Sequence, residues 1–520
     1  MKTMKYISIL IAGWAFLLTA CDDSFTELTP LGSITSGNFW TSSEDAVTAA
    51  NGLYEHWDDN NLFGRGFMYL IAASDDIMQG RTDAAAAAMR NFQATGQEGR
   101  MSSLYPRLYT VIQRANNIIA FVPEMDIPQN LKNRVLGEAY FMRAHSYFWL
   151  APRFADERAG IPIVTEENMN ENFFPRPSSV VENYRMIEAD LNRAADLLPY
   201  FTEYASTDLG RAHKDAENAF LAKTYLYWAH HDNSKWAEVV THCDLVINSP
   251  TGRALINTGN PEEDFASVFY VDNNFSSEYV FSTVSSNERG QILPGVMLEN
   301  TGWGLYNGWG TFSPTLELYN AFEEGDPRRS ATLLEFGDEF MFLGEPRRYY
   351  SGNSWTGIQV NKYMHPYRFP EEVHLNPNGN YVTTNLNIPL IRFAEILLMK
   401  SEALIMQGQN GDQPLNLVRE RAGLAAKINA TLEDLKQERR VELAAEYADR
   451  HLDLIRWGDA QAAYSQPATG RDHFNKTDPD SDYEVYEVWP ARTFNPNIHH
   501  VWPIPPNVLA VSGIEQNQGW

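Results

Sequence analysis

One short run of the sequence alternates aromatic rings with glycine. Residues 302–310 read Gly-Trp-Gly-Leu-Tyr-Asn-Gly-Trp-Gly, which places Trp303, Tyr306, Asn307 and Trp309 close together. Glycines leave neighbouring rings exposed and let a backbone approach a ligand, while an amide side chain both donates and accepts hydrogen bonds. Because rings stack on the apolar faces of sugars, the run predicts a carbohydrate platform. The alternative is that one or more rings pin the loop onto the protein.

A second glycine-containing stretch, residues 351–357, offers Trp355 as a further ring for stacking.

Signatures of catalysis are missing from the sequence. It contains no Gly-x-Ser-x-Gly turn and no His-Glu-x-x-His zinc helix, and its two His-His pairs are adjacent residues that point different ways on a helix. None of the 67 acidic residues is singled out as one of the two carboxylates of a glycosidase. We therefore predict a non-enzyme without catalytic residues, metal or cofactor.

The N-terminus has the features of an export signal. Two lysines precede an apolar run from Tyr6 to Leu18, shorter than the roughly 20 residues of a membrane span. The run ends in Leu-Thr-Ala-Cys, which resembles the bacterial lipobox, where a cysteine is acylated and the chain is cut just before it. We predict a lipoprotein signal peptide at 1–20, lipidation at Cys21 and a flexible tether at 21–37. An ordinary secretory peptide is the alternative.

The charge balance excludes several partners. The formal net charge is −26, spread along the chain, which repels nucleic acid and anionic membrane surfaces.

The other cysteine, Cys243, lies in an apolar helical pattern and is expected to be a small core residue. With Cys21 lipidated, no intramolecular disulfide can form, so the fold must depend on burial alone.

Helical periodicity dominates the rest of the chain, which we expect to form one domain over 38–520. Apolar residues recur at helical spacing, and several helices fall into pairs joined by short turns that resemble tetratricopeptide units. The expected helices cover residues 103–121, 129–150 (ending at Ala151-Pro152), 180–198, 216–230, 235–248, 391–407, 415–422 and 432–454. This predicts a mostly α fold, with helix pairs forming a right-handed scaffold.

The stretch from about 250 to 385 differs. It is rich in glycine, asparagine, proline and aromatic residues and lacks long helical patterns, although Tyr279–Val284 is typical of a strand. We expect a long, irregular, loop-rich insertion that carries short strands. Such insertions on a rigid scaffold are common places for binding sites.

Several segments together resemble the SusD/RagB family of outer-membrane glycan-binding lipoproteins. They cover nearly the whole mature chain, and their order behind a lipobox makes the resemblance specific. The chain departs from the family at Glu446-Tyr447-Ala448-Asp449, where Glu-Gly is usual, which puts a local turn in question. The segments are 137–150 with 160–163, 321–329, 388–403, and 438–443 with 450–458, 502–505 and 516–520.

The resemblance implies a cell-surface protein that captures oligosaccharides or polysaccharide. It would hand them to a SusC-like TonB-dependent transporter, while its lipid anchor holds it in the outer membrane facing the cell exterior. It also draws attention to Ser74–Arg81, which resembles a family segment near sugar-contacting residues. There Asp75 or Asp76 with Arg81 could bracket vicinal hydroxyls, or an aspartate could instead cap a helix.

Arginines on the apolar helices are expected to have a structural role. Their guanidinium groups suit bidentate pairing with carboxylates between packed helices. They are Arg143, Arg392, Arg439, Arg440, Arg450 and Arg456, beside Glu138, Glu395, Glu402, Glu442 and Asp453.

Three alternatives remain open for the function: an exported glycoside hydrolase, an adhesive surface protein, and a peptide-capturing member of the same family.

Overall fold

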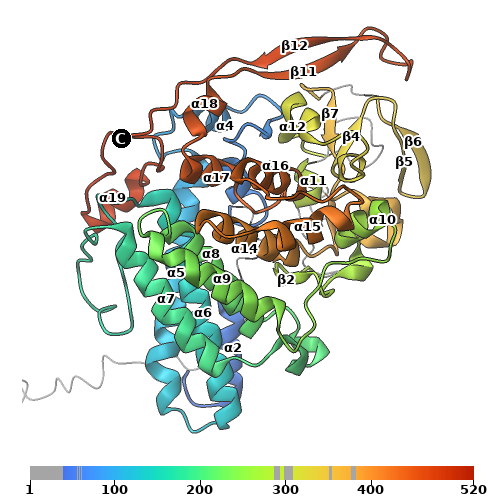
Figure 1. Cartoon of the computed structure of the whole chain (residues 1–520). Helices are drawn as coiled ribbons and strands as arrows, with labels where there is room; N and C mark the ends of the chain where they lie inside the picture. The colour runs from blue at the N-terminus through green and yellow to red at the C-terminus, as the bar shows by residue number, and fades with distance from the viewer. Residues whose placement is uncertain are drawn as a thin grey trace, which may run out of the picture.

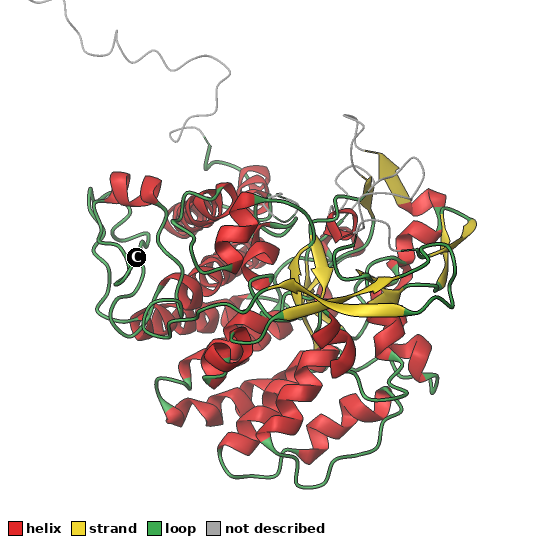
Figure 2. Cartoon of the chain, turned by 90° about the horizontal axis from the view of Figure 1, so that it is seen from above, coloured by secondary structure: helices red, strands yellow, loops and turns green. Residues whose placement is uncertain are grey.

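The computed structural model describes residues 39–520 except 56, 58, 60, 286–292, 298–307, 351–353 and 376–381. The predicted signal peptide, the tether and Cys21 lie outside these described residues. Long helices form one side of the molecule, and short strands and helices form the other (Figure 1). Seen from above, the strands gather in one part of the molecule, with helices beside and below them (Figure 2). The predicted mostly α fold is confirmed.

The long helices pack on one another in a continuous series. From α5 to α9 the helices that pack together follow one another along the chain, but the next neighbour of α9 is α14. The intervening residues are therefore inserted between two packed helices of the scaffold. In order of packing the helices are α5 (Gly99–Phe121), α6 (Gln129–Phe154), α7 (Val180–Leu197), α8 (Lys214–Trp228), α9 (Trp236–Ile247) and α14 (Phe393–Met406), which contacts both α15 (Asp412–Arg421) and α16 (Leu432–Glu442).

The strands are short and pair two by two. All the pairs within the described residues are antiparallel, and most lie inside the inserted segment. The pairs are β1 (Ile77–Gln79) with β3 (Phe312–Pro314), β2 (Tyr279–Ser282) with β10 (Pro389–Arg392), β4 (Leu333–Glu335) with β7 (Ile358–Val360), β5 (Glu339–Phe342) with β6 (Glu345–Arg348), β8 (Val373–Leu375) with β9 (Val382–Thr384), and β11 (Ala468–His473) with β12 (Tyr483–Trp489). β2 confirms the strand expected there.

The shorter helices flank the scaffold and the strands. Among them, α2 packs on both α5 and α6, so the N-terminal part of the described chain joins the helical side. They are α2 (Ser43–Leu53), α3 (Gly66–Ile71), α4 (Ala84–Arg90), α10 (Pro261–Ala266), α11 (Leu293–Met297), α12 (Leu316–Ala321), α13 (Arg328–Thr332), α17 (Arg450–Trp457), α18 (Ala460–Tyr464) and α19 (Pro506–Ser512).

Helix boundaries differ from the sequence-based expectation by a few residues in several places, and two of these differences have a clear physical reason. The predicted break at Ala151-Pro152 is wrong, because α6 continues through Pro152 to Phe154. The proline stands in the last turn of α6, where few backbone hydrogen bonds remain to be lost, and the Arg153 guanidinium donates to the Trp149 carbonyl at 3.0 Å.

The single helix predicted over 432–454 is also wrong. α16 ends at Glu442 and α17 begins at Arg450, and between them Ala445 has a left-handed φ of 66°. The turn directs Glu446 inward to Arg392 and lets the Asp449 carboxylate cap α17 at Leu452 N–H (3.1 Å). Long-range ion pairing therefore fixes a break that no glycine or proline marks in the sequence.

A buried network of arginines and carboxylates joins the insertion to the helices. Arg392, 1% exposed, binds Glu278 at 2.7 Å, Glu442 at 2.8 Å and Glu446 at 2.6 Å. Glu442 also forms ion pairs with Arg421 and, at 2.9 Å, with Arg328. Burial alone would raise the pKa of Glu442, but the three arginines hold that pKa far below its ordinary value. The carboxylate is therefore charged inside the protein, and each partner fixes a different element.

The expected ion pairs between helices are confirmed, although some partners differ. Arg143 binds Asp190 of α7 at 2.7 Å, and its predicted neighbour Glu138 instead binds Arg211 at 3.0 Å. Arg439 binds Asp453 and Glu395, two of the carboxylates expected to pair with these arginines, at 2.7 and 3.0 Å.

The apolar core is continuous through most of the molecule. Cys243 is fully buried in it, which confirms its predicted role as a core residue. Among the described residues, no helix combines the length and the apolar character needed to cross a membrane.

The buried network makes a prediction for stability. Replacing Arg392 by Met should lower the free energy of unfolding by about 3–5 kcal/mol, because three buried carboxylates lose a cation. Urea denaturation measures the effect. Arg348→Met is the control, since Arg348 pairs with a Glu339 that is 73% exposed, and it should cost less than about 1 kcal/mol. A loss from Arg392→Met as small as the control would contradict the assigned role.

A buried histidine predicts acid sensitivity. His145 accepts a hydrogen bond from the Trp149 indole at 2.8 Å, and burial, helped by the charge of Lys223, lowers the pKa of His145 to about 3. Between that value and the unfolded pKa of about 6.5, the unfolded chain binds a proton that the folded protein does not, so stability falls as the pH drops below 6.5.

The His145→Gln variant keeps an acceptor without the titration. We expect its loss of unfolding free energy between pH 7 and pH 5 to be about 2 kcal/mol smaller than in the original protein, as measured by urea denaturation at both values. An identical loss in the two proteins would mean that His145 does not cause the sensitivity.

Candidate functional site

The pairing of β1 with β3 brings together two residues that the sequence predicted separately. Gln79 lies opposite Phe312, so the segment that follows β1 runs beside the segment that precedes β3. There the Arg81 guanidinium donates from Nη1 to the Trp309 carbonyl at 3.1 Å. Gln79 fixes the loop after β1 by donating to the carbonyls of Arg81 and Asp83 at 2.7 and 3.0 Å. The Arg81 guanidinium thus contacts the backbone of a half-buried tryptophan at the edge of the insertion.

Glycines allow this close approach. A Cβ on Gly80 would lie 2.6 Å from Ser313 Oγ and 2.7 Å from the Gly310 carbonyl, so only glycine fits between the two segments. Gly310 has a left-handed φ of 56°, which turns the chain directly after Trp309. Gly310, one of the glycines predicted to expose rings, and Gly80 therefore set the position of Trp309 against Arg81.

A second arginine, which the sequence analysis missed, completes the group. The Arg65 guanidinium lies over the Trp309 ring, 4.3 Å from its centroid, in cation–π geometry. Arg65 is positioned by the tight turn before α3, where a Cβ on Gly66 would come within 1.9 Å of the Asn61 carbonyl oxygen. The signal that could have identified it is the sequence Gly64-Arg65-Gly66, an arginine between two turn-forming residues.

Trp355 packs beside the middle of β1. With Met78 of β1, it packs in a small apolar cluster around Trp489, whose ring centroid is 6.1 Å from that of Trp355. The Trp355 carbonyl accepts a hydrogen bond from the Tyr486 hydroxyl on the hairpin β11–β12. Trp355 is therefore partly held by structural contacts, while Tyr486 keeps 36% of its surface exposed beside it.

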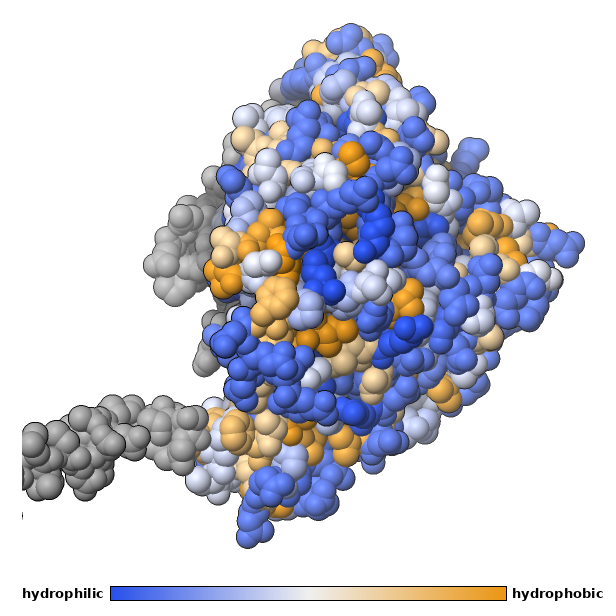
Figure 3. All heavy atoms as spheres, turned by 90° about the vertical axis from the view of Figure 1, so that its left-hand side faces the viewer, coloured by the Kyte–Doolittle hydropathy of each residue, from blue (hydrophilic) through white to orange (hydrophobic). Residues whose placement is uncertain are grey.

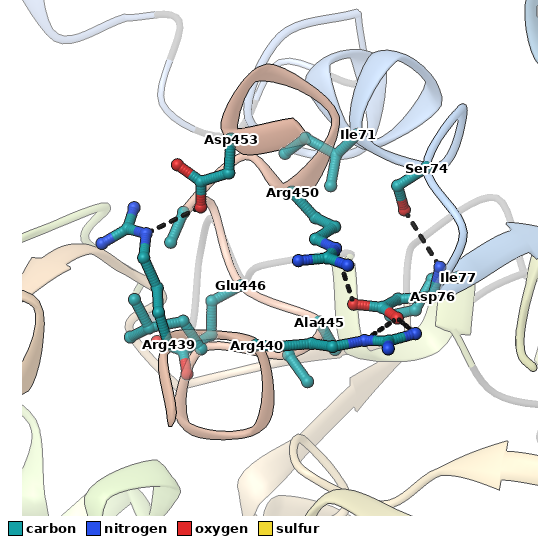
Figure 4. Close-up of a pocket in the computed structure, with 13 residues that line it drawn as sticks. Ile71, Ser74, Asp76, Ile77, Arg439, Arg440, Ala445, Glu446, Arg450 and Asp453 are labelled. Atoms are coloured by element: carbon teal, nitrogen blue, oxygen red, sulfur yellow. Dashed lines mark hydrogen bonds and ion pairs between the residues drawn. The ribbon is translucent and has the colours of Figure 1, made fainter. Parts of the chain in front are cut away.

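Asp75 and Asp76 contact arginines of α16 and α17. Figure 4 shows Asp76 between Arg440 and Arg450, with Arg440 Nε donating to Asp76 at 2.7 Å. Arg450 Nε donates to Asp75 at 3.0 Å. The enclosed space beside these groups is only about 20 Å³, which suits a water molecule and not a sugar ring. In the described residues neither aspartate contacts Arg81, with which it was expected to bracket sugar hydroxyls, and neither aspartate caps a helix.

One group of side chains has the composition of a metal site. Ligand atoms of Asp156, Glu157 and His500 lie within 4.8 Å of one another. However, Arg158 Nε donates to Asp156 at 2.9 Å, and His500 Nε2 contacts the same carboxylate oxygen at 2.9 Å. The guanidinium supplies the positive charge that a metal ion would bring, so we interpret the group as a structural ion pair.

An apolar groove of about 620 Å³ lies on a different side of the molecule. It runs between α5, the segment after α6, and α19, and its walls include the stacked rings of Tyr105 and Tyr109. Figure 3 shows this side, with apolar patches on a mostly hydrophilic surface. A mostly apolar wall leaves sugar hydroxyls without hydrogen-bond partners, so the groove suits a carbohydrate less well than the arginines at Trp309.

The structure thus brings together Arg81 and Trp309 and places Trp355 in a separate apolar cluster with Met78 of β1. Trp303, Tyr306 and Asn307 lie outside the described residues. The roles of all these side chains in ligand binding remain predictions, together with those of Asp75 and Asp76.

Comparison with known proteins shows that two related family models match different parts of the chain. Residues 272–520 match the model of the SusD family, and residues 35–226 match a family described as starch-binding and associating with the outer membrane. The two matches include the strand pair and both arginines of the group at Trp309.

Individual relatives extend over nearly the full length. A SusD-like protein of Bacteroides ovatus is 26% identical, over 95% of this chain and 94% of its own. A crystal structure of a SusD-like protein from Bacteroides fragilis has a TM-score of 0.78 at 22% identity, covering 94% of this chain and 100% of that one. A structure named as a laminarin-binding SusD-like protein has a TM-score of 0.70 at 25% identity, covering 92% and 99%.

The contact at Gly80 yields a prediction. Gly80→Ala should lower the free energy of unfolding by about 1–3 kcal/mol, because its Cβ collides with a backbone carbonyl that cannot move freely. Thermal or urea denaturation measures the change. Gly52→Ala is the control, since that helical position has nothing within 4 Å of the added Cβ and alanine favours the helix. Equal stability of the Gly80 variant and the original protein would show that the two segments can separate without cost.

Proposed function

This chain belongs to the SusD/RagB family, and on that basis we propose that it captures oligosaccharides or polysaccharide at the cell surface and delivers them to a SusC-like TonB-dependent transporter. The observation that carries the binding role is the group at Trp309. A half-buried ring with Arg81 at its carbonyl and Arg65 on its face combines an apolar surface with polar donors. Sugars need both, because their C–H faces are apolar and their hydroxyls are polar.

Trp303, Tyr306 and Asn307 belong to the same proposed site. They precede Trp309 directly in the sequence, and two of them add the rings and one the amide that suit stacked sugars. Trp355, in the cluster with Met78 of β1, is proposed as a further contact. Arginines already bind the carboxylates of Asp75 and Asp76, so these two residues are less suited to contact a sugar.

The names of the relatives support a carbohydrate ligand. One structural relative is named for laminarin binding, and one family model is described by starch binding. These ligands belong to those proteins, and for this chain we propose only the class, a glycan. The description of that family model also mentions the outer membrane, which agrees with a lipid anchor at Cys21 and a tether over 21–37. An anchored protein would meet its transporter at high effective concentration.

Hydrolysis is less well supported than binding. A glycosidase needs two carboxylates on either side of the scissile bond. In the described part of the chain, the groups that meet at the Trp309 ring and carbonyl are guanidinium groups, and the nearby Asp76 is bound to Arg440. The guanidinium groups of Arg65 and Arg81 suit the binding of a sugar, and among the described residues we assign no pair of carboxylates to its cleavage.

The proposal predicts the effect of removing the indole. Trp309→Ala should weaken glycan affinity about tenfold or more in isothermal titration calorimetry, because one stacking surface is lost. Trp40→Ala is the matched control, since that half-buried ring stacks on Phe121 at 5.3 Å and should leave affinity unchanged.

Two outcomes would count against the proposal. Equal affinity of the Trp309 variant and the original protein would remove Trp309 from the site. Release of new reducing ends when the protein is incubated with the bound glycan would favour the hydrolase instead.

A further inference from the structure

Resting on the proposed glycan binding, we infer that the ligand is an anionic carbohydrate, whose carboxylate or sulfate group is bound by Arg65 and Arg81 beside Trp309. The two guanidinium groups approach one residue from different parts of the chain. Arg65 lies against the Trp309 ring, and Arg81 is hydrogen-bonded to the Trp309 carbonyl. Both guanidinium groups thus contact Trp309, one at its ring and one at its backbone carbonyl, and we infer that an anionic substituent beside this residue is their shared ligand.

Arg65 is unusual because, among the described residues, its buried guanidinium has neither a counter-ion nor a hydrogen-bond acceptor. It is only 6% exposed, and its Nε is buried with no hydrogen-bond acceptor. Neither Arg65 nor Arg81 forms an ion pair with a carboxylate in the part of the chain that the structure describes. The terminal nitrogens of Arg65 make no hydrogen bond to described residues and, unlike Nε, are not among the buried atoms. They are thus the donors that an incoming group can reach.

Other buried arginines in this protein are treated differently. Arg143, Arg392 and Arg439 each bind at least two carboxylates. Arg492, which is 8% exposed, donates instead to the carbonyls of residues 73, 74 and 90. In a chain with 67 acidic and 41 basic residues, a nearby carboxylate could readily have evolved. An unpaired buried cation is costly to keep, which points to a partner that comes from outside.

The nearest acid of the loop does not serve as that partner. Asp83, two residues after Arg81, caps α4 by accepting from Ala86 N–H at 3.0 Å. Its other oxygen accepts from the Tyr69 hydroxyl at 3.3 Å. Both oxygens are therefore engaged, and the Arg81 fork keeps donors beyond the one bound to the Trp309 carbonyl.

The chemistry of the arginine fork defines the class of ligand. Guanidinium groups bind planar or tetrahedral oxyanions through two parallel hydrogen bonds, and such charge-assisted bonds are about twice as strong as neutral ones. Arg65 covers one face of the indole, so a sugar ring that contacts Trp309 cannot stack on that face. A uronate carboxylate or a sulfate ester on that sugar would then lie beside the guanidinium groups.

Matched pairs of glycans test the inference. Oligogalacturonate is compared with its carboxyl-reduced form, and carrageenan oligosaccharide with its desulfated form, by calorimetry with the purified protein. A glycan array with uronate-bearing, sulfated and neutral members widens the search. We expect an anionic glycan to bind at least tenfold more tightly than its neutral counterpart. The pair that shows the preference identifies carboxylate or sulfate as the group recognised.

Variants assign the preference to the two arginines. Arg65→Met and Arg81→Gln should each reduce affinity for the anionic glycan tenfold or more, while affinity for its neutral form changes less than threefold. Arg329→Gln is the control, because that half-buried guanidinium stacks on Tyr319, 4.8 Å from the ring centroid, and should change neither affinity. Thermal unfolding accompanies each measurement, and we expect Arg65→Met to be at least as stable as the original protein.

Several outcomes would overturn the inference. Equal binding of anionic and neutral forms, or a preference that survives both arginine variants, would leave glycan binding intact but remove the anionic class. Strong destabilisation by Arg65→Met would make Arg65 a structural residue and would overturn it too. An array without any bound glycan would overturn the proposed function and this inference with it.

Discussion

Charge buried in the interior is the constraint on which the structure depends. Glu442 is completely buried, yet three arginines keep it ionised, and each arginine belongs to a different element. Removing a charge from water costs several kcal/mol unless partners with good geometry surround it. The elements that carry Glu442, Arg328, Arg392 and Arg421 can therefore be buried together only in one arrangement. This arrangement fixes α13, α14, α15 and α16 against one another.

The same network attaches the insertion to the helical scaffold. Glu278 stands directly before β2 and binds Arg392 at the start of α14, so the inserted segment is fixed near its beginning and at its end. Between these points the chain can form loops without losing its place on the scaffold. The short pair β1–β3 then ties the loop around Trp309 to the N-terminal part of the domain. A rigid framework with an irregular insertion places ligand-facing residues without making them carry the fold.

The contrast between satisfied and unsatisfied arginines separates structure from function in this molecule. Arg440 and Arg450 face Asp76 and Asp75 and close the small space shown in Figure 4. Arg65 and Arg81, only a short distance along the chain from these aspartates, have no such partners in the described residues. Proteins commonly accept local instability at binding sites, because a group that is already satisfied by the protein has little to offer a ligand.

The amino-acid sequence by itself determined the mostly helical class, most helix positions, the helix pairs and the burial of Cys243, because these depend on local periodicity and side-chain size. It also indicated that arginines would pair with carboxylates, and it drew attention to Arg81 and Trp309 separately. Only the tertiary structure decided which carboxylate meets which arginine, that α16 breaks before Glu446, and that Arg65 joins Trp309. These features depend on contacts between residues far apart in the sequence, for example 54 positions for Arg392 and Glu446 and more than 200 for Arg65 and Trp309, and their energies come from burial, which no local pattern of residues specifies.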